Sequence, residues 1–291
     1  MSSNSKTSSP SITLFRGWLD PGKHVWSPFV IKTEARLRFA GIKYATDRGS
    51  PLHAPKGKIP YLEYHGELPT DVADASSTRY DENSEPITSL ADSALIIKTL
   101  TKAGVLSDLN AGLTAQEKVL DLGIRTMLED RLYFYHTRER WIDNYYTMRD
   151  HALSAIPYPI RIFVGILAAR KHSAMLYGQG TLRFTQEELT GFKHEIWGTL
   201  AELLQVRKGE ALRKREAQSA RKADPFWVLG GKEPTEADTV LFGFVITVLI
   251  STAGPDSQKV VKGYPVLVEY AERIHDRYFP DYEKGTMFTI G

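Results

Sequence analysis

The pattern of apolar residues changes once along the chain, and this change limits the fold more than any other feature of the sequence. Up to about residue 104, short apolar segments typical of strands alternate with helical segments, whereas from Thr114 onward the apolar residues follow helical spacing. A chain of 291 residues is long enough for two domains of about 150 residues each. We therefore expect an α/β domain at 12–104 and an all-helical domain at 114–283, behind a disordered Ser-rich tail at 1–11.

The α/β domain is predicted to contain four strands, at 12–15, 43–46, 59–64 and 87–90. Its two helices are predicted at 27–40 and 94–100. The first helix has strong local signals, because Ser27 is a good N-cap, Pro28 suits the first turn and Gly41 suits the C-cap. The segment 67–86 has no hydrophobic period and is rich in acidic residues, so we expect a surface loop inserted before the last strand.

The helical domain is predicted to open at a capping box. Thr114 is followed three residues later by Glu117, and a long helical run continues to about Arg149, where two prolines soon end it. Further helices are predicted at 161–177, 186–221, 236–252 and 266–277. A variant capping box at 235–238 opens the third of these, whose closely spaced apolar residues indicate burial.

Composition excludes several classes of function. The absence of cysteine excludes disulfides, Cys-ligated zinc, iron–sulfur clusters and a nucleophilic thiol of the protein itself. The 8 histidines lack metal-ligand spacing, so we expect no metal. The net charge is +2, and the basic segment 207–222 lacks interleaved aromatic residues, which favours a solvated helix face over a nucleic-acid site. The longest apolar stretch, 240–250, is shorter than the roughly 18 residues of a membrane span. We expect a cytoplasmic protein with no nucleic-acid or membrane partner.

Four motifs together resemble the glutathione transferases. They are Ser27-Pro28-Phe29, Ile59-Pro60, Asp92-Ser93 and the capped helix at 235–238. The stretches 27–44, 55–63 and 91–100, together with Arg140-Trp141, more closely resemble the failed-axon-connections and metaxin-like branch. The resemblance spans about 12–283 and implies an α/β thioredoxin-like N-terminal domain followed by an all-α C-terminal helical domain. Since cysteine is absent, a thioredoxin-type disulfide oxidoreductase and cysteine-based deglutathionylation are excluded.

The resemblance implies that glutathione, as co-substrate or cofactor, binds the first domain. Ser27 lies at a helix N-terminus, which carries a partial positive charge, and its hydroxyl would donate a hydrogen bond to the glutathione sulfur. A cis Ile59-Pro60 bond would present the backbone of Ile59 to the cysteinyl unit. For Ser27 an alternative interpretation stays open, namely that it only caps the helix.

The other glutathione contacts implied by the resemblance come from two short segments. Ser93 would hold the γ-glutamyl carboxylate, and Asp92 would accept from the α-amine. Lys58, with Lys56 and His53, would face the glycyl carboxylate. The structural alternatives are a helix cap for Asp92-Ser93 and a solvated basic loop for the other three residues.

We expect an acceptor pocket between the two domains, with candidate residues Trp18, Trp26, Tyr133, His136 and Arg140. Tyr133, His136 and Arg140 fall at positions i, i+3 and i+7 and share one helix face. Leu132 and Tyr135 point elsewhere and are expected in the core. The alternative for the whole set is packing, because aromatic residues at helical spacing more often form core than pocket.

These expectations favour a glutathione transferase-like enzyme that activates the thiol for addition to an electrophilic small molecule. Conjugation and glutathione-assisted isomerisation both begin with this addition. Two alternatives stay open: an enzyme of the same fold that acts without glutathione, and a non-catalytic metaxin-like interaction module. The resemblance also implies a homodimer.

Overall fold

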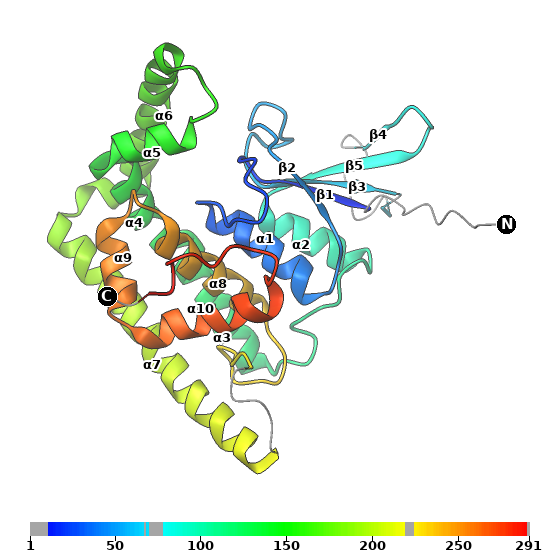
Figure 1. The fold of residues 1–291 in the computed structure, drawn as a ribbon, viewed down its shortest axis with the longest axis vertical. Helices are drawn as coiled ribbons and strands as arrows, with labels where there is room; N and C mark the ends of the chain where they lie inside the picture. Colours follow the sequence, from blue (N-terminus) through cyan, green and yellow to red (C-terminus); the bar gives the residue numbers. More distant parts are fainter. Residues whose placement is uncertain (1–10, 67, 70–77, 219–223, 290–291) are drawn as a thin grey trace.

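The computed structural model describes residues 11–66, 68–69, 78–218 and 224–289. Figure 1 shows a sheet with two helices at one side of the molecule and a larger group of helices beside it. The predicted tail, except for Ser11, lies outside the described residues. The predicted fold class is therefore confirmed in outline, an α/β N-terminal part followed by an all-helical part.

The sheet has five strands in the order β2-β1-β3-β5-β4. Their bounds are Ile12–Phe15 (β1), Ala45–Asp47 (β2), Tyr61–His65 (β3), Thr78–Tyr80 (β4) and Pro86–Ala91 (β5). Strand β2 runs parallel to β1, and the other neighbours are antiparallel. The second and third strands begin two residues later than predicted, at Ala45 and Tyr61.

Two helices, α1 (Pro28–Phe39) and α2 (Ser93–Lys102), cover the sheet. Their apolar residues form a small core with β1, β3 and β5 that includes Ile12, Leu14, Leu37, Leu62 and Ile96. The predicted caps are confirmed, because Ser27 precedes α1 with extended backbone angles and Gly41 follows it with a φ of 68°.

The prediction of a surface loop at 67–86 is wrong for its last part. Residues Thr78–Tyr80 form β4, which pairs with β5 so that Thr78 lies opposite Thr88, and their hydroxyl oxygens are 3.1 Å apart. Arg79 on β4 also pairs with Glu63 on β3 at 2.8 Å. The strand depends on these cross-strand partners rather than on a local hydrophobic pattern. Residues 67 and 70–77 of the insertion lie outside the described residues.

The long helix predicted from Thr114 is not one continuous α-helix. It consists of α3 (Ala115–Thr126), the π-helical turn η2 (Met127–Leu132), α4 (Tyr133–Arg138), the π-helical turn η3 (Glu139–Asp143) and α5 (Tyr145–Ala152). The predicted capping box is confirmed, with the Thr114 backbone N–H donating to Glu117 Oε2 at 2.8 Å. Periodicity of apolar residues cannot distinguish a π-helical turn from an α-helical one in so short a segment.

The remaining helices are α6 (Tyr158–Gln179), η4 (Thr181–Arg183), α7 (Gln186–Gln218), α8 (Glu236–Ile250), α9 (Pro255–Lys262) and α10 (Pro265–Tyr278). Helix α9 was not predicted. Its first backbone N–H groups, at Asp256 and Ser257, donate to Glu139 Oε1 at 2.9 and 3.1 Å. The helix also has local signals that the sequence analysis missed, with Pro255 in its first turn and Gly263 at its C-cap.

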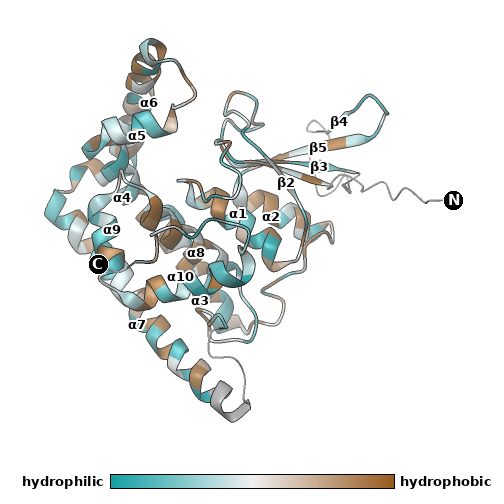
Figure 2. Cartoon of the chain, viewed as in Figure 1, coloured by the Kyte–Doolittle hydropathy of each residue, from teal (hydrophilic) through white to brown (hydrophobic). Residues whose placement is uncertain are grey.

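Helix α8 joins the two parts of the molecule by lying against α1. From Ala237 to Leu249 every residue of α8 is buried, and Figure 2 shows hydrophobic ribbon gathered along α1, α2 and α8. Gly243 permits a close approach, since a Cβ at this position would lie 2.6 Å from the backbone oxygen of Pro28. The variant capping box at the start of α8 is confirmed, with both Thr235 and Asp238 participating.

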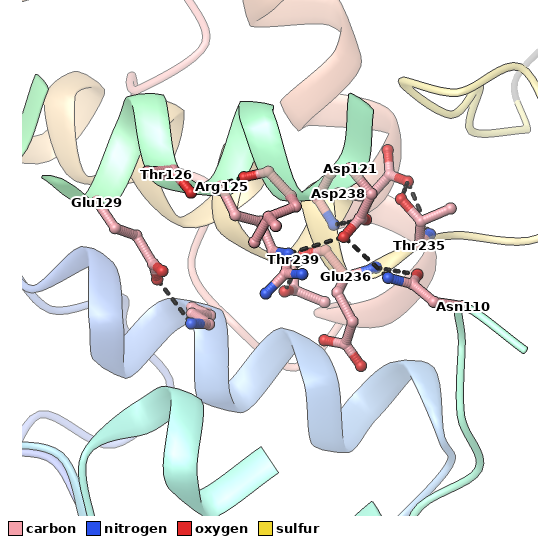
Figure 3. A network of polar contacts seen from close by, with 12 residues as sticks. Asn110, Asp121, Arg125, Thr126, Glu129, Thr235, Glu236, Asp238 and Thr239 are labelled. Atoms are coloured by element: carbon pink, nitrogen blue, oxygen red, sulfur yellow. Dashed lines mark hydrogen bonds and ion pairs between the residues drawn. The ribbon is translucent and has the colours of Figure 1, made fainter. Parts of the chain in front are cut away.

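A polar network fixes the N-terminal end of α8 between the two parts, as Figure 3 shows. Asp121 of α3 is fully buried and accepts from the backbone N–H of Ala237 at 2.7 Å and from Arg125 Nε at 2.7 Å. Two ion pairs of 2.6 Å tie α1 to its neighbours, from Lys32 to Glu129 and from Arg36 to Glu236. These partners hold the α1 helix rigidly under the sheet.

The described residues contain neither a group suited to a metal ion nor a single helix that could span a membrane. No group of three or more His, Asp or Glu side chains in that part of the chain is arranged to hold a metal ion. No single helix within it is long and apolar enough to cross a bilayer; α8 and α9 reach that length together, but the chain bends by 118° between them.

Candidate glutathione site

The register of the sheet brings two of the predicted glutathione motifs, Ile59-Pro60 and Asp92-Ser93, to one edge. Phe15 at the end of β1 lies opposite Tyr61 at the start of β3, and Tyr61 lies opposite Ala91 at the end of β5. Ile59-Pro60 and Asp92-Ser93 therefore lie next to each other, just beyond this edge. The chain leaves β1 at the same edge and reaches Ser27 at the start of α1.

Ser27 is placed both to cap the helix and to donate a hydrogen bond. The Val30 backbone N–H donates to Ser27 Oγ at 3.4 Å, so the cap uses an acceptor lone pair. The hydroxyl hydrogen is left for another partner. The first turn of α1 contains no acidic residue, so the partial positive charge of the helix N-terminus is not offset there. The cap and the donor interpretations of Ser27 are thus compatible.

The Ile59–Pro60 peptide bond is cis, as the resemblance implies. Pro60 is buried, and Ile59 is half-buried at the edge of the sheet. Lys58, Lys56 and His53 are all exposed in the loop before this bond. Their exposure fits both a solvated loop and a contact to a ligand carboxylate.

Asp92 has an unusual backbone conformation, with a φ of 74°. Positive φ in a residue other than glycine is uncommon and often marks a functional position. Its Oδ1 accepts from the backbone N–H groups of Ala94 and Leu95 at 3.1 and 3.3 Å, which leaves Oδ2 unused by the cap of α2. Ser93 follows in the first turn and is 6 % exposed.

The two tryptophans of the predicted acceptor pocket lie in the loop between β1 and α1, and both contact His151 of α5. Trp26 stacks on His151 with ring centroids 3.5 Å apart, and Trp18 Nε1 donates to the His151 backbone oxygen at 3.5 Å. Burial lowers the pKa of His151 to about 4, which keeps the ring neutral. His151 was missed by the sequence analysis, because a single histidine at a helix end carries no signal of its own.

The three predicted pocket residues of the long helical run lie beneath the loop that precedes α1. Tyr133 contacts the Phe29 ring edge-on at 5.0 Å, and Arg140 donates to the Trp26 backbone oxygen at 3.4 Å. His136 lies deeper, where it stacks on Trp197 and burial holds its pKa well below the usual value.

The structure therefore brings Tyr133 and Arg140 close to the start of α1 and places His136 in the core. Leu132 and Tyr135 are buried, as predicted, with exposed fractions of 0 % and 3 %. The basic face of α7 is largely paired where it is described, for example Arg207 with Glu210 at 3.0 Å and Lys208 with Glu269 at 2.5 Å.

Comparison with known proteins identifies the family. A model described as the glutathione S-transferase N-terminal domain matches residues 28–148, and one described as the glutathione S-transferase C-terminal domain matches residues 217–274. Together they cover more than half of the chain. The chain belongs to the glutathione transferase-like superfamily, with a thioredoxin-like N-terminal domain and a helical C-terminal domain.

Within this superfamily the chain is related to Failed axon connections of Drosophila melanogaster. The two are 26 % identical over 273 residues, which cover 89 % of this chain and 56 % of that protein. The chain thus spans about half the length of this curated relative.

Among solved structures, glutathione transferase GSTFuA2 from Phanerochaete chrysosporium superposes with a TM-score of 0.50 at 15 % identity, covering 93 % of this chain and 99 % of that one. A glutathione transferase family member from Pseudomonas fluorescens with two glutathione bound gives a TM-score of 0.49 at 15 % identity, covering 93 % and 90 %.

Proposed function

We propose that the protein binds glutathione at the edge formed by Ser27, Ile59-Pro60 and Asp92-Ser93 and activates its thiol for addition to an electrophilic small molecule. One observation carries the proposal: the register of β1, β3 and β5 brings Ile59-Pro60 and Asp92-Ser93 together at the edge of the sheet where the loop that leads from β1 to Ser27 begins. Membership of the glutathione transferase-like superfamily supports the choice of ligand.

The chemistry required of this site is the stabilisation of a thiolate. A free thiol with a pKa near about 8.5 is mostly protonated at neutral pH, and the thiolate is the nucleophile. The hydroxyl of Ser27 would donate to the sulfur, and the N-terminus of α1 would add positive potential. The thiol proton leaves to solvent, and the sulfur lone pair forms the bond to the electrophilic carbon while the π bond of the acceptor breaks. The π electrons move to the activating group of the acceptor, and a proton from solvent completes the addition. Conjugation keeps this bond, whereas isomerisation breaks it again.

The rest of the ligand would be held by its charged ends. The Ser93 hydroxyl and the N-terminus of α2 suit the γ-glutamyl carboxylate, and the free Oδ2 of Asp92 suits the α-amine. Lys58 would approach the glycyl carboxylate from the exposed loop. Trp18, Trp26 and Tyr133 would border the acceptor.

The test is a titration with glutathione, followed by a comparison of Ser27→Ala with Ser27→Thr. We expect binding in the millimolar range or tighter and a loss of turnover of about tenfold or more in Ser27→Ala, because one donor to the anion is lost. Ser27→Thr keeps a hydroxyl and a cap, so it controls for the cost of the helix cap. Absence of glutathione binding at millimolar concentration would contradict the proposal.

The stacked rings of Trp26 and His151 favour a second candidate, a glutathione-binding module without turnover. They join the loop before Ser27 to α5 on the side where an acceptor would enter. Glutathione binding without any conjugation across a panel of electrophiles would support this candidate. We further propose a cytoplasmic homodimer, to be tested by fractionation and by light scattering on the purified protein.

A further inference from the structure

One buried cation differs from all the others in the described part of the chain. Arg16, Lys32, Arg36, Arg149 and Lys193 are buried, and each has a carboxylate oxygen within 3.3 Å. Arg140 is 7 % exposed, yet no carboxylate of the described residues forms an ion pair with it. A buried charge without a counter-ion is costly, so it marks a candidate functional position.

Arg140 has only neutral hydrogen-bond partners. Its two terminal nitrogens donate to the backbone oxygens of Trp26 and Thr247 at 3.4 and 3.3 Å. The carboxylate next to it in the sequence, Glu139, is committed elsewhere: it pairs with Lys193 at 2.9 Å and accepts from Ser257 and the N-terminus of α9. The charge of Glu139 still acts on Arg140 and favours the protonated guanidinium, but no carboxylate forms an ion pair or a hydrogen bond with it among the described residues.

The other titratable groups around Arg140 do not supply a negative charge. Burial raises the pKa of Tyr133, so its phenol stays neutral, and burial lowers the pKa of both His136 and His151. Burial also lowers the pKa of Arg140, to about 10, which still leaves the guanidinium protonated at neutral pH. The charged guanidinium therefore lies under the peptide that connects Trp26 to Ser27.

We propose that Arg140 is a positioning residue that fixes the Trp26–Ser27 peptide and adds positive potential at the start of α1, so that a thiolate beside Ser27 is stabilised. This inference rests on the proposed glutathione site. The charge and the helix N-terminus act in the same direction, and low local polarity lets both act over a longer distance than in water.

The test measures the thiol pKa of glutathione bound to the protein, from the ultraviolet absorbance of the thiolate as a function of pH. In the wild type we expect a pKa below that of the free thiol. In Arg140→Met we expect the pKa of the bound thiol to rise by about one unit, which lowers the thiolate fraction and the turnover at neutral pH by up to about tenfold. Arg140→Lys keeps the charge and is expected to retain most of the lowered pKa, so it remains informative if Arg140→Met does not fold.

Two controls separate electrostatics from folding. Arg131→Met removes an exposed arginine from the same helical run and should leave the thiol pKa unchanged. S-methylglutathione has no ionisable thiol, so its affinity should change less than threefold in Arg140→Met.

Three results would overturn the inference. An unchanged thiol pKa in a folded Arg140→Met variant would do so while leaving the proposed function intact. So would an equal loss of affinity for glutathione and for S-methylglutathione without a change in pKa. Absence of glutathione binding to the wild type would overturn the inference and the proposed function together.

Discussion

Helix α1 meets two different environments along its length. In its middle, Lys32 and Arg36 are buried and paired with carboxylates of η2 and α8. Each positive charge on that face of α1 therefore has a counter-ion. At its start, Ser27 caps the helix through a 3.4 Å contact, no acid occupies the first turn, and Arg140 stands nearby without a counter-ion. One helix thus combines a satisfied interface with an end that retains positive potential. The comparison separates residues that hold the two parts together from residues available for an anionic ligand.

The largest effect on the free energy of unfolding is expected from a methyl group added where α1 and α8 are in close contact. A Cβ in Gly243→Ala would lie 2.6 Å from the backbone oxygen of Pro28 and 3.1 Å from the backbone nitrogen of Lys32. Because backbone atoms cannot rotate away, we expect a loss of about 3 kcal/mol in the free energy of unfolding, measured in urea. Gly191→Ala is the control: it meets nothing within 4 Å in α7 and should stabilise by roughly 0.5–1 kcal/mol. Equal midpoints for the two variants would argue against the close contact.

A smaller loss in the free energy of unfolding is expected when a buried ion pair of α1 is broken. Glu129→Gln leaves Lys32, which is 2 % exposed, without a counter-ion. We expect a loss of about 2 kcal/mol in the free energy of unfolding, since the stranded charge remains buried. Glu63→Gln removes an ion pair of similar length whose Arg79 side chain is 56 % exposed, and it should cost at most about 0.5 kcal/mol. If the two variants lose the same free energy of unfolding, the buried Lys32–Glu129 pair contributes no more to stability than the exposed Arg79–Glu63 pair.

The third effect depends on pH and concerns the loop before Ser27. Burial lowers the pKa of His151 to about 4 in the folded protein, whereas an unfolded histidine titrates near about 6.5. The unfolded chain binds the proton more tightly, so stability is fully present above this range and is lost as pH falls from about 6.5 toward 4. Since the ring is partly exposed, we expect a loss on the order of 1 kcal/mol that His151→Gln abolishes. Unfolding curves at a series of pH values measure it, and His53→Gln, at an exposed position, should behave as the wild type does.

The smallest effect on the free energy of unfolding is expected from Asp92, the N-cap of α2. Asp92→Asn keeps a residue that tolerates the φ of 74° and keeps the cap of α2, so the free energy of unfolding should change by less than about 0.5 kcal/mol. Removal of the charge should nevertheless weaken glutathione binding severalfold in calorimetry. Asp92→Ala, which loses both the cap and the tolerance, should cost about 1–2 kcal/mol. Unchanged affinity in Asp92→Asn would assign this residue to the cap alone.

The sequence predicted those elements whose signals are local. Ser27 and Gly41 bound α1, and the capping box of Thr114 and Glu117 opens α3. The strand at Thr78–Tyr80 was missed because it has no hydrophobic pattern of its own and is defined by pairing with β5. Helix α9 was missed although Pro255 lies in its first turn, and its N-terminal N–H groups are capped by the distant Glu139.

The candidate site follows the same division. The three ligand motifs were found through their resemblance to a family, and sheet register places two of them, Ile59-Pro60 and Asp92-Ser93, together. The stack of Trp26 on His151 and the missing partner of Arg140 depend on how the loop meets the helical part, which no spacing along the chain encodes.

The number of residues between α3 and α5, a segment that includes the two π-helical turns η2 and η3, sets the direction in which the side chains of α5 point. Each residue of an α-helix turns the chain by about 100°, so deletion of one residue from α4, the α-helical stretch between these turns, would rotate everything that follows. The ring of His151 would no longer meet Trp26. Within this lineage, insertions and deletions should therefore accumulate between β3 and β5 and be rare between Met127 and Asp143. A change of length there would re-aim the wall of the site without altering one of its side chains.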